Sequence, residues 1–247
     1  MHSWELVTMP IEPTQQIAAA GSRISELIRR SDLTTPAVRL GRWRVRDVVA
    51  HLGGVHRWAT RIVVNRSMDG PGFTKSKLDG VELCDWFDEG VAELVAAFET
   101  NDPDGPCPNF NPGSAKTVSW WERRQMHETI VHRWDVENAL ECTTPIAADV
   151  SVDCIDEYLD VFVRTRGKQT LTAPLVISVT EPPRSWTLVP ADRPGRLDIF
   201  AGNSGRSTTA MSGDAEALLL SLWRRQTLEE ADLQIDGDPA VALSLFG

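Results

Sequence analysis

Two of the five histidines occupy positions from which they could bind a metal ion. The apolar periodicity of residues 45–64 predicts a helix, and His51 lies in the middle of its apolar face beside Val55. On a later helix Glu128 and His132 are four residues apart, so their side chains are neighbours on one face. Two imidazoles and one carboxylate form a catalytic zinc set, which leaves a fourth position for water or substrate. We therefore predict one divalent metal ion, zinc by preference, held by these three side chains.

A metal-free arrangement is the alternative that the spacing leaves open. A buried carboxylate is costly unless it is paired or coordinates a cation, and a hydrogen bond from His51 or His132 would also satisfy Glu128. The run from His127 to His132 is not the metalloprotease motif H-E-x-x-H, because its histidines are five residues apart and point ~140° apart on a helix. His56 falls off the apolar face of its helix, and we expect it at the surface or at the edge of the core.

Three further side chains share the faces of the expected ligands. Asp135 either accepts a hydrogen bond from a ligand histidine and fixes its tautomer, or is a solvated charge; its position favours the first role. Trp58 and Trp121 lie on the ligand faces of their helices. We expect them either to wall a pocket for a cofactor or to pack in the core.

The elements that must position these side chains fall into two groups. Amphipathic stretches joined by loops rich in proline and glycine predict a four-helix bundle, with helices over residues 14–31, 45–64, 83–100 and 119–140. Ser119 and Glu122 have the spacing of a capping box at the start of the fourth helix. The remaining chain predicts a small α+β unit with helices over 150–163, from Asp214 and from Pro239, and strands over 175–180, 185–189, 206–211 and 233–235. The predicted fold is α+β overall, with domains at 1–145 and 146–247.

Composition limits the classes of partner. The net charge of −10 argues against nucleic acid, whose binding proteins carry a basic face. No apolar run approaches the roughly 18 residues that a membrane span requires, and residues 1–13 do not resemble a secretion signal. The four cysteines have no C-x-x-C spacing, which indicates reduced, structural thiols. These features predict a cytoplasmic protein with no membrane partner.

Two stretches in the first part and several residues in the second resemble one known family. The stretches from Trp43 to Leu52 and from His127 to Asp135 are similar to the mycothiol-dependent maleylpyruvate isomerase family, whose amino-terminal domain is a DinB-like four-helix bundle. The similarity continues in the second part at Gly213-Asp-Ala, Leu218-Leu-Leu220, Trp223, Arg225 and Gly237-Asp238. The resemblance implies that His51, Glu128 and His132 are zinc ligands and that the second domain has a sterol-carrier-like α+β fold.

One departure from the family concerns an arginine. The family tends to have Gly-Arg after the leucine-rich helix, and that arginine is implicated in handling the carboxylates of the substrate. This chain has Arg224-Arg225, and we choose Arg225 as the catalytic match. The alternative is a pair of solvated charges that complement the dipole at a helix carboxyl end.

The chemistry that follows from the resemblance is thiol activation. Zinc with an open position lowers the pKa of a bound thiol, and the family uses the small thiol mycothiol as cosubstrate. We expect an S-transferase in which the thiolate attacks an electrophilic substrate. A cis–trans isomerase of the maleylpyruvate type is the alternative reaction. Two further hypotheses are a hydrolase that uses zinc-bound water and a non-enzymatic, metal-stabilised binding or regulatory protein.

Overall fold

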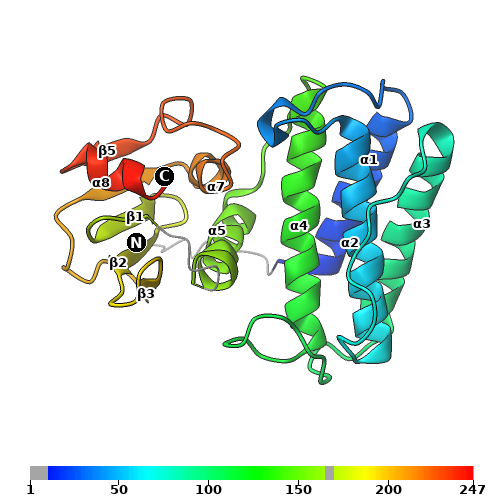
Figure 1. The fold of residues 1–247 in the computed structure, drawn as a ribbon, viewed down its shortest axis with the longest axis horizontal. Coiled ribbons are helices and arrows are strands. Elements are labelled where there is room, and N and C mark those ends of the chain that lie inside the picture. The colour runs from blue at the N-terminus through cyan, green and yellow to red at the C-terminus, as the bar shows by residue number, and fades with distance from the viewer. Residues whose placement is uncertain (1–10, 165–169, 247) are drawn as a thin grey trace, which may run out of the picture.

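The first part of the chain is a bundle of four helices. A computed structural model describes residues 11–164 and 170–246. The bundle contains α1 (Pro13–Ile28), α2 (Val45–Asn65), α3 (Gly80–Glu99) and α4 (Val118–Ala139), and a short 3₁₀ turn, η1 (Val38–Leu40), precedes α2. The four helices lie side by side in Figure 1. The predicted helical bundle is confirmed, with helix ends shifted by a few residues.

The predicted capping box at the start of α4 is wrong. The helix begins one residue earlier than expected, after Thr117, so Ser119 lies inside the helix and cannot cap it. Glu122 instead accepts a hydrogen bond from the hydroxyl of Thr14 on α1. This contact ties the second turn of α4 to the first turn of α1.

The second part is a small sheet with helices, as the fold class predicted. It contains α5 (Ala148–Glu157), a π-helical extension η2 (Tyr158–Val163), α7 (Ala215–Leu222) and α8 (Pro239–Ser244). The strands are β1 (Leu175–Val179), β2 (Arg184–Pro190), β3 (Leu197–Ala201), β4 (Ala210–Gly213) and β5 (Gln234–Asp236). They form one sheet in the order β3-β2-β1-β4-β5, in which β1 and β4 are parallel and the other neighbours antiparallel.

Two strands differ from the sequence prediction. The strand expected over 206–211 forms only from Ala210, where its backbone reaches β1. The strand β3 was not predicted, because only Leu197 of its five side chains is buried and the usual alternation is weak. Pairing with β2 at the edge of the sheet, rather than a buried face, keeps β3 extended.

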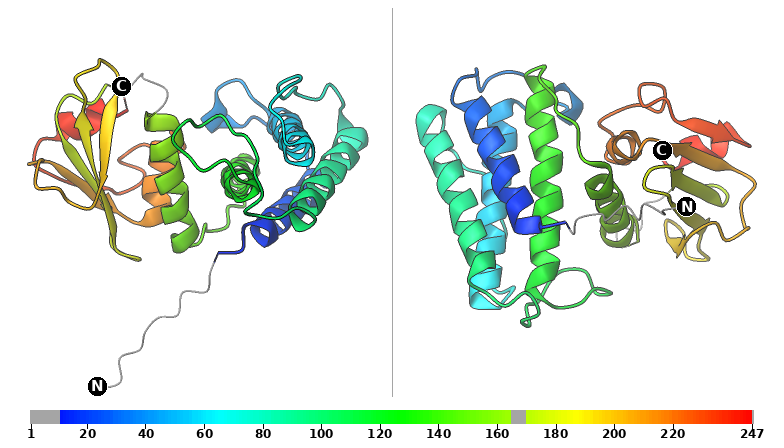
Figure 2. Two further views of the ribbon diagram at one scale, coloured as in Figure 1. Left: turned by 90° about the horizontal axis from the view of Figure 1, so that it is seen from below. Right: turned by 180° about the vertical axis from the view of Figure 1, so that it is seen from behind.

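The helix α4 is the member of the bundle that faces the second part of the chain. In Figures 1 and 2 it separates the rest of the bundle from α5 and the sheet. Buried apolar side chains form one core that runs from the bundle through α5 into the sheet, and a second cluster fills the other end of the bundle. As a result α4 is buried on most of its circumference, and several of its polar side chains are buried with it. The division at residue 145/146 falls between α4 and α5 and stays a prediction.

No helix of residues 11–164 and 170–246 combines the length and apolar character that a membrane span needs. The amino-terminal residues 1–10, which entered the argument against a secretion signal, lie outside the described part of the chain.

Candidate functional site

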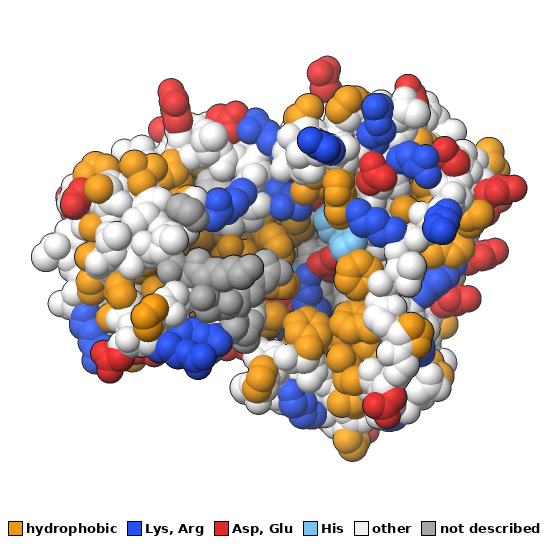
Figure 3. Space-filling view, in the orientation of Figure 1, with side chains coloured by type: hydrophobic (Ala, Val, Ile, Leu, Met, Phe, Trp, Pro, Cys, Tyr) orange, Lys and Arg blue, Asp and Glu red, His pale blue; other side chains and the backbone are white. Residues whose placement is uncertain are grey.

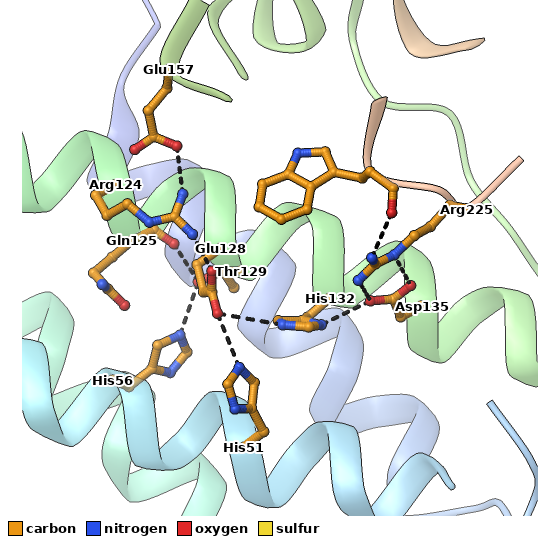
Figure 4. A network of polar contacts seen from close by, with 11 residues as sticks. His51, His56, Arg124, Gln125, Glu128, Thr129, His132, Asp135, Glu157 and Arg225 are labelled. Carbon is orange, nitrogen blue, oxygen red and sulfur yellow. Dashed lines mark hydrogen bonds and ion pairs between the residues drawn. The ribbon is translucent and has the colours of Figure 1, made fainter. Parts of the chain in front are cut away.

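Three side chains from α2 and α4 converge on one point. The Oε1 atom of Glu128 lies 3.2 Å from Nε2 of His51 and 3.4 Å from Nε2 of His132. One ligand atom from each residue falls within 4.8 Å of the other two. The three side chains are largely buried, with 15%, 14% and 9% of their surfaces exposed for His51, Glu128 and His132. The structure thus brings the predicted ligands together (Figure 4).

The donor set fits a divalent cation. Two neutral imidazole nitrogens and one carboxylate oxygen are ligands that zinc accepts. The Nδ1 atom of His51 is buried and has no hydrogen-bond partner among the described residues. The Nε2 atom of His51 faces the carboxylate of Glu128, so Nε2 is the nitrogen that can coordinate an ion. Because the same three groups also form hydrogen bonds with one another, the metal-free pair remains the alternative.

The ligand His132 is held from behind by Asp135 and Arg225. The Nδ1–H of His132 donates to Oδ2 of Asp135 at 2.8 Å, which directs its Nε2 atom toward Glu128. Arg225 reaches Asp135 from the second part of the chain and donates from Nε and Nη2 at 2.9 and 2.8 Å. Burial tends to raise the pKa of Asp135, but the hydrogen bonds from His132 and Arg225 hold it below its usual value. Asp135 therefore remains a charged acceptor.

The structure brings Arg225, and not Arg224, to this site. Arg225 lines the cavity described below, whereas Arg224 is exposed and adopts a left-handed conformation with φ 59° at the end of α7. Glycine adopts that conformation without strain, which gives a physical reason for a glycine at the preceding position in the family. The predicted role of Arg225 in anchoring an anion stays a prediction, because two of its nitrogens are engaged by Asp135 and a third donates to the carbonyl of Trp223.

The ligand Glu128 has its own buried partner, which the sequence analysis missed. Arg124, one turn earlier on α4, donates to Oε2 of Glu128 and also to Glu157 on α5. Burial opposes the charge on Glu128, but Arg124 and the two histidines lower its pKa well below the usual value. Arg124 is four residues before Glu128, so helical periodicity alone could have placed it on the ligand face.

His127 belongs to the same charged network but points away from the metal site. Its Nε2 atom lies 2.8 Å from Asp153, and its Nδ1 atom lies 3.0 Å from Glu157, both on α5. The side chain is 1% exposed. It therefore joins α4 to α5, in agreement with the helical geometry that pointed it away from His132.

The expectation that His56 lies at the surface or at the edge of the core is wrong. His56 is completely buried, and the ring of Phe87 on α3 packs against its imidazole with ring centroids 5.9 Å apart. The hydroxyl of Thr129 donates to the carbonyl of Gln125 at 2.7 Å, so it must accept from Nε2 of His56, which lies 2.9 Å away. Burial lowers the pKa of His56 to about 3. His56 is a neutral structural residue.

A cavity of about 490 Å³ opens above the three ligands. In Figure 3 it is the hollow between the two parts, with histidine on the side of the bundle and hydrophobic side chains nearby. Its polar wall contains the three ligands with Arg124, Gln125 and Arg225, and its apolar wall contains Leu40, Trp43, Val55, Trp58, Phe73, Phe110, Phe162 and Trp223. The second part of the chain contributes three of these residues, so both parts form the cavity.

The two predicted tryptophans have different positions. Trp58 lines the cavity, as one of its two predicted roles required. Trp121 takes the other of its two expected roles, because it is fully buried in the core and packs edge-on behind Trp58 with ring centroids 5.1 Å apart. Its Nε1–H donates to the carbonyl of Pro108 at 2.8 Å. Trp121 supports the wall rather than forming it.

A glycine of α2 allows a loop to complete the cavity. A Cβ atom at Gly54 would lie 2.3 Å from the carbonyl oxygen of Thr74, so only glycine permits this approach of the loop. The neighbouring Phe73 then lies with its ring centroid 5.1 Å from that of His51. The sequence analysis found neither Phe73 nor Phe110, since both lie in loops without periodicity.

The comparisons with known proteins agree with this architecture. The family model described as the mycothiol maleylpyruvate isomerase N-terminal domain matches residues 14–137, and the model of the corresponding C-terminal domain matches residues 149–244. The chain belongs to the mycothiol maleylpyruvate isomerase family. This confirms the resemblance carried by the stretches that contain the three candidate ligands.

Solved structures with the same fold include a mycothiol-dependent maleylpyruvate isomerase and a histidine-to-alanine mutant of it. Each aligns with a TM-score of 0.57 and 13% sequence identity over 86% of this chain and 88% of the other. Likeness at this identity shows the fold alone. No match was found among curated proteins.

Proposed function

We propose that this protein is a mycothiol-dependent enzyme that holds one zinc ion with His51, Glu128 and His132. The observation that carries the proposal is the convergence of three ligand atoms in a cavity whose described lining contains no serine, threonine, tyrosine, cysteine or lysine. Because the lining offers none of these nucleophilic side chains, we infer that the nucleophile of the reaction is a small molecule that diffuses in. A bound zinc ion would lower the pKa of a coordinating thiol, so that a thiolate is available at neutral pH.

The residues around the site have positioning roles in this mechanism. Asp135 keeps the proton of His132 on Nδ1 and leaves Nε2 free to bind the ion. Arg225 fixes Asp135, and Arg124 fixes the second oxygen of Glu128.

Isomerisation of a conjugated double bond is the first candidate reaction. The family and the solved structures of the same fold carry the name of an isomerase, which supports this reaction better than the S-transfer favoured by the sequence analysis. The thiolate adds to one alkene carbon, the former double bond rotates, and expulsion of the thiolate restores the double bond. The thiol is regenerated and no proton is consumed overall.

Transfer of the thiol to its electrophile is the second candidate. It shares the first addition step, but the adduct takes up a proton and leaves as a thioether. The aromatic wall of the cavity favours it, because such a wall suits electrophiles other than small polar acids. A non-enzymatic binding or regulatory protein is the remaining alternative.

The test combines metal content with thiol dependence. Wild-type protein purified without chelator should hold close to one zinc ion per chain and should convert maleylpyruvate or a model electrophile only when mycothiol is added. His51→Ala and His132→Ala should lose both the metal ion and the activity. Full zinc content in both variants would contradict the metal site, and turnover without thiol would indicate a hydrolase.

A further inference from the structure

Gln125 is a buried amide on the floor of the cavity, one turn before the candidate ligand Glu128 on α4. The residue is 1% exposed and belongs to the lining of the cavity. In Figure 4 the side chains of Gln125 and Glu128 both point from α4 toward α2. The Oε1 atom of Gln125 is buried and has no hydrogen-bond partner among the described residues. Such an oxygen destabilises the ligand-free protein, and a ligand that donates a hydrogen bond to it would remove this cost.

The polar groups that neighbour Gln125 are engaged elsewhere. The guanidinium of Arg124 is directed at carboxylates, to which it donates two hydrogen bonds. The hydroxyl of Thr129 donates to the backbone carbonyl of Gln125 and accepts from His56. Apart from Nδ1 of the candidate ligand His51, Oε1 of Gln125 is the only buried side-chain nitrogen or oxygen of the described lining that lacks a partner. Its partner would therefore come from a bound ligand.

The floor of the cavity runs along α4 from the three ligands past Gln125 to two aromatic rings. Trp121, one turn before Gln125, packs behind Trp58 with ring centroids 5.1 Å apart. Phe110 stacks on Trp58, with centroids 6.0 Å apart and 20° between the ring planes, and is 42% exposed. Arg225 lies on the opposite side of the ligands, where it contacts the carboxyl-terminal part of α4. A ligand that extends from the metal site to solvent past Phe110 therefore passes Gln125.

The hydrogen-bonding capacity of the Gln125 amide distinguishes between the possible ligands. A glutamine amide has an oxygen that accepts and an NH₂ group that donates. Carboxylates and an enolate oxygen only accept hydrogen bonds, so they could pair with the NH₂ group but would leave Oε1 unsatisfied. A residue of an extended peptide presents its N–H and its C=O along the same edge, and this pair matches both halves of a glutamine amide. Mycothiol contains such a unit, because its cysteine is in amide linkage at both its nitrogen and its carbonyl carbon.

We propose that Gln125 binds the cysteinyl part of the thiol cosubstrate, with Oε1 accepting from its N–H and Nε2 donating to its C=O. This assignment rests on the proposed thiol chemistry. The terminal torsion of a glutamine side chain is soft, so the amide can turn its edge toward the ligand without a change of the backbone. The pairing holds the thiol with its sulfur toward the three ligands and leaves the side of the cavity that carries Arg225 to the second substrate. Gln125 thus orients the nucleophile, and an acidic second substrate is compatible with this arrangement.

Calorimetric titration of the zinc-loaded full chain with mycothiol, without any second substrate, measures this interaction directly. Gln125→Met keeps the length of the side chain but removes both hydrogen-bonding groups, and it should lower the affinity for mycothiol by about tenfold, the effect of two neutral hydrogen bonds. The zinc content should be unchanged, and the stability of the ligand-free protein should not fall, because the unsatisfied oxygen is gone. The matched control is Gln226→Met, since Gln226 also has a buried Oε1 without a partner among the described residues but lies outside the lining of this cavity. Wild-type affinity for mycothiol in Gln125→Met would overturn the proposal.

Two small thiols test which group of the cosubstrate Gln125 contacts. N-acetylcysteine N′-methylamide has both the N–H and the C=O of the cysteinyl unit, whereas 3-mercapto-N-methylpropanamide lacks the acetylated amino group. Wild-type protein should bind the first thiol about fivefold more tightly than the second, and Gln125→Met should bind the two with equal affinity. The same ratio of affinities in both proteins would mean that Gln125 does not contact the N–H, and would overturn the assignment.

Steady-state kinetics with maleylpyruvate separate failure of this inference from failure of the proposed function. In Gln125→Met the KM for mycothiol should rise by about tenfold, while the KM for maleylpyruvate should stay unchanged. The opposite pattern would assign Gln125 to the second substrate and overturn the inference, with the proposed function intact. If the wild type binds mycothiol without turnover, the calorimetric result alone decides the inference. Wild-type protein that neither binds mycothiol nor holds zinc would contradict the proposed function itself, and the inference with it.

Discussion

Replacement of Asp135 by asparagine should weaken zinc binding without removing any ligand. Asp135 is 3% exposed and accepts three hydrogen bonds, one from His132 and two from Arg225. Asparagine has nearly the same shape but no charge. Its amide group must also point one nitrogen at a donor, either His132 or Arg225. The variant therefore loses at least one charge-assisted hydrogen bond and leaves the orientation of the His132 ring less restricted.

The size of the effect follows from these contacts. A hydrogen bond to a charged group contributes about 1.5–3 kcal/mol, and loss of a carboxylate behind a ligand histidine usually lowers metal affinity by about 10- to 100-fold. We expect a zinc affinity in this range below that of the wild type for Asp135→Asn. The free energy of unfolding of the metal-free protein should fall by about 3 kcal/mol, the lower end for breaking a buried ion pair, because Arg225 keeps some access to solvent.

Competition with a chromogenic chelator measures the zinc affinity, and urea unfolding in the presence of a chelator measures the stability. Asp198→Asn is the control, since this exposed aspartate lies on β3 away from the cavity. Unchanged zinc affinity in Asp135→Asn would refute the positioning role. Arg225→Ala distinguishes the two roles of the arginine: a lower zinc affinity supports positioning through Asp135, whereas an unchanged affinity with a higher KM supports an anion anchor.

Three further predictions concern buried polar residues and the loop over α2. His56 has a pKa of about 3 in the folded protein against 6.5 in a free histidine, so below pH 6.5 the unfolded chain takes up a proton that the folded chain does not. Between pH 7.5 and pH 5, with chelator present, the free energy of unfolding of the wild type should therefore fall by about 2 kcal/mol more than that of His56→Gln. His127→Ala should retain zinc but lower the free energy of unfolding by about 3–5 kcal/mol, because Asp153 and Glu157 lose their shared partner. Loss of zinc in this variant would mean that the ion pairs of His127 also position Glu128. Gly54→Ala should displace the loop that carries Phe73 and lower the free energy of unfolding by about 1–3 kcal/mol, whereas Gly72→Ala, with nothing within 4 Å of its added Cβ, should leave the free energy of unfolding unchanged. Equal stability of the two variants would contradict the close approach of Thr74 to Gly54.

The sequence alone determined the helices and the residues that share a helix face. The pairing of Glu128 with His132, and the place of His51 on an apolar face, follow from a period that repeats every few residues and needs no knowledge of distant parts of the chain. The same reasoning identified Asp135 as a neighbour of the ligands. It failed for β3, whose extended form depends on its partner strand more than on its own pattern.

Only the tertiary structure decided what covers each helix face. His56 lies off the apolar face of α2 by periodicity, yet Phe87 of α3 and Thr129 of α4 contact it in the core. Trp121 shares the ligand face of α4, yet Trp58 lies between it and the cavity. The contact of Arg225 with Asp135 joins residues 90 positions apart. Such contacts depend on how loops and domains pack, and packing is set by the shapes of side chains that meet only in the folded chain.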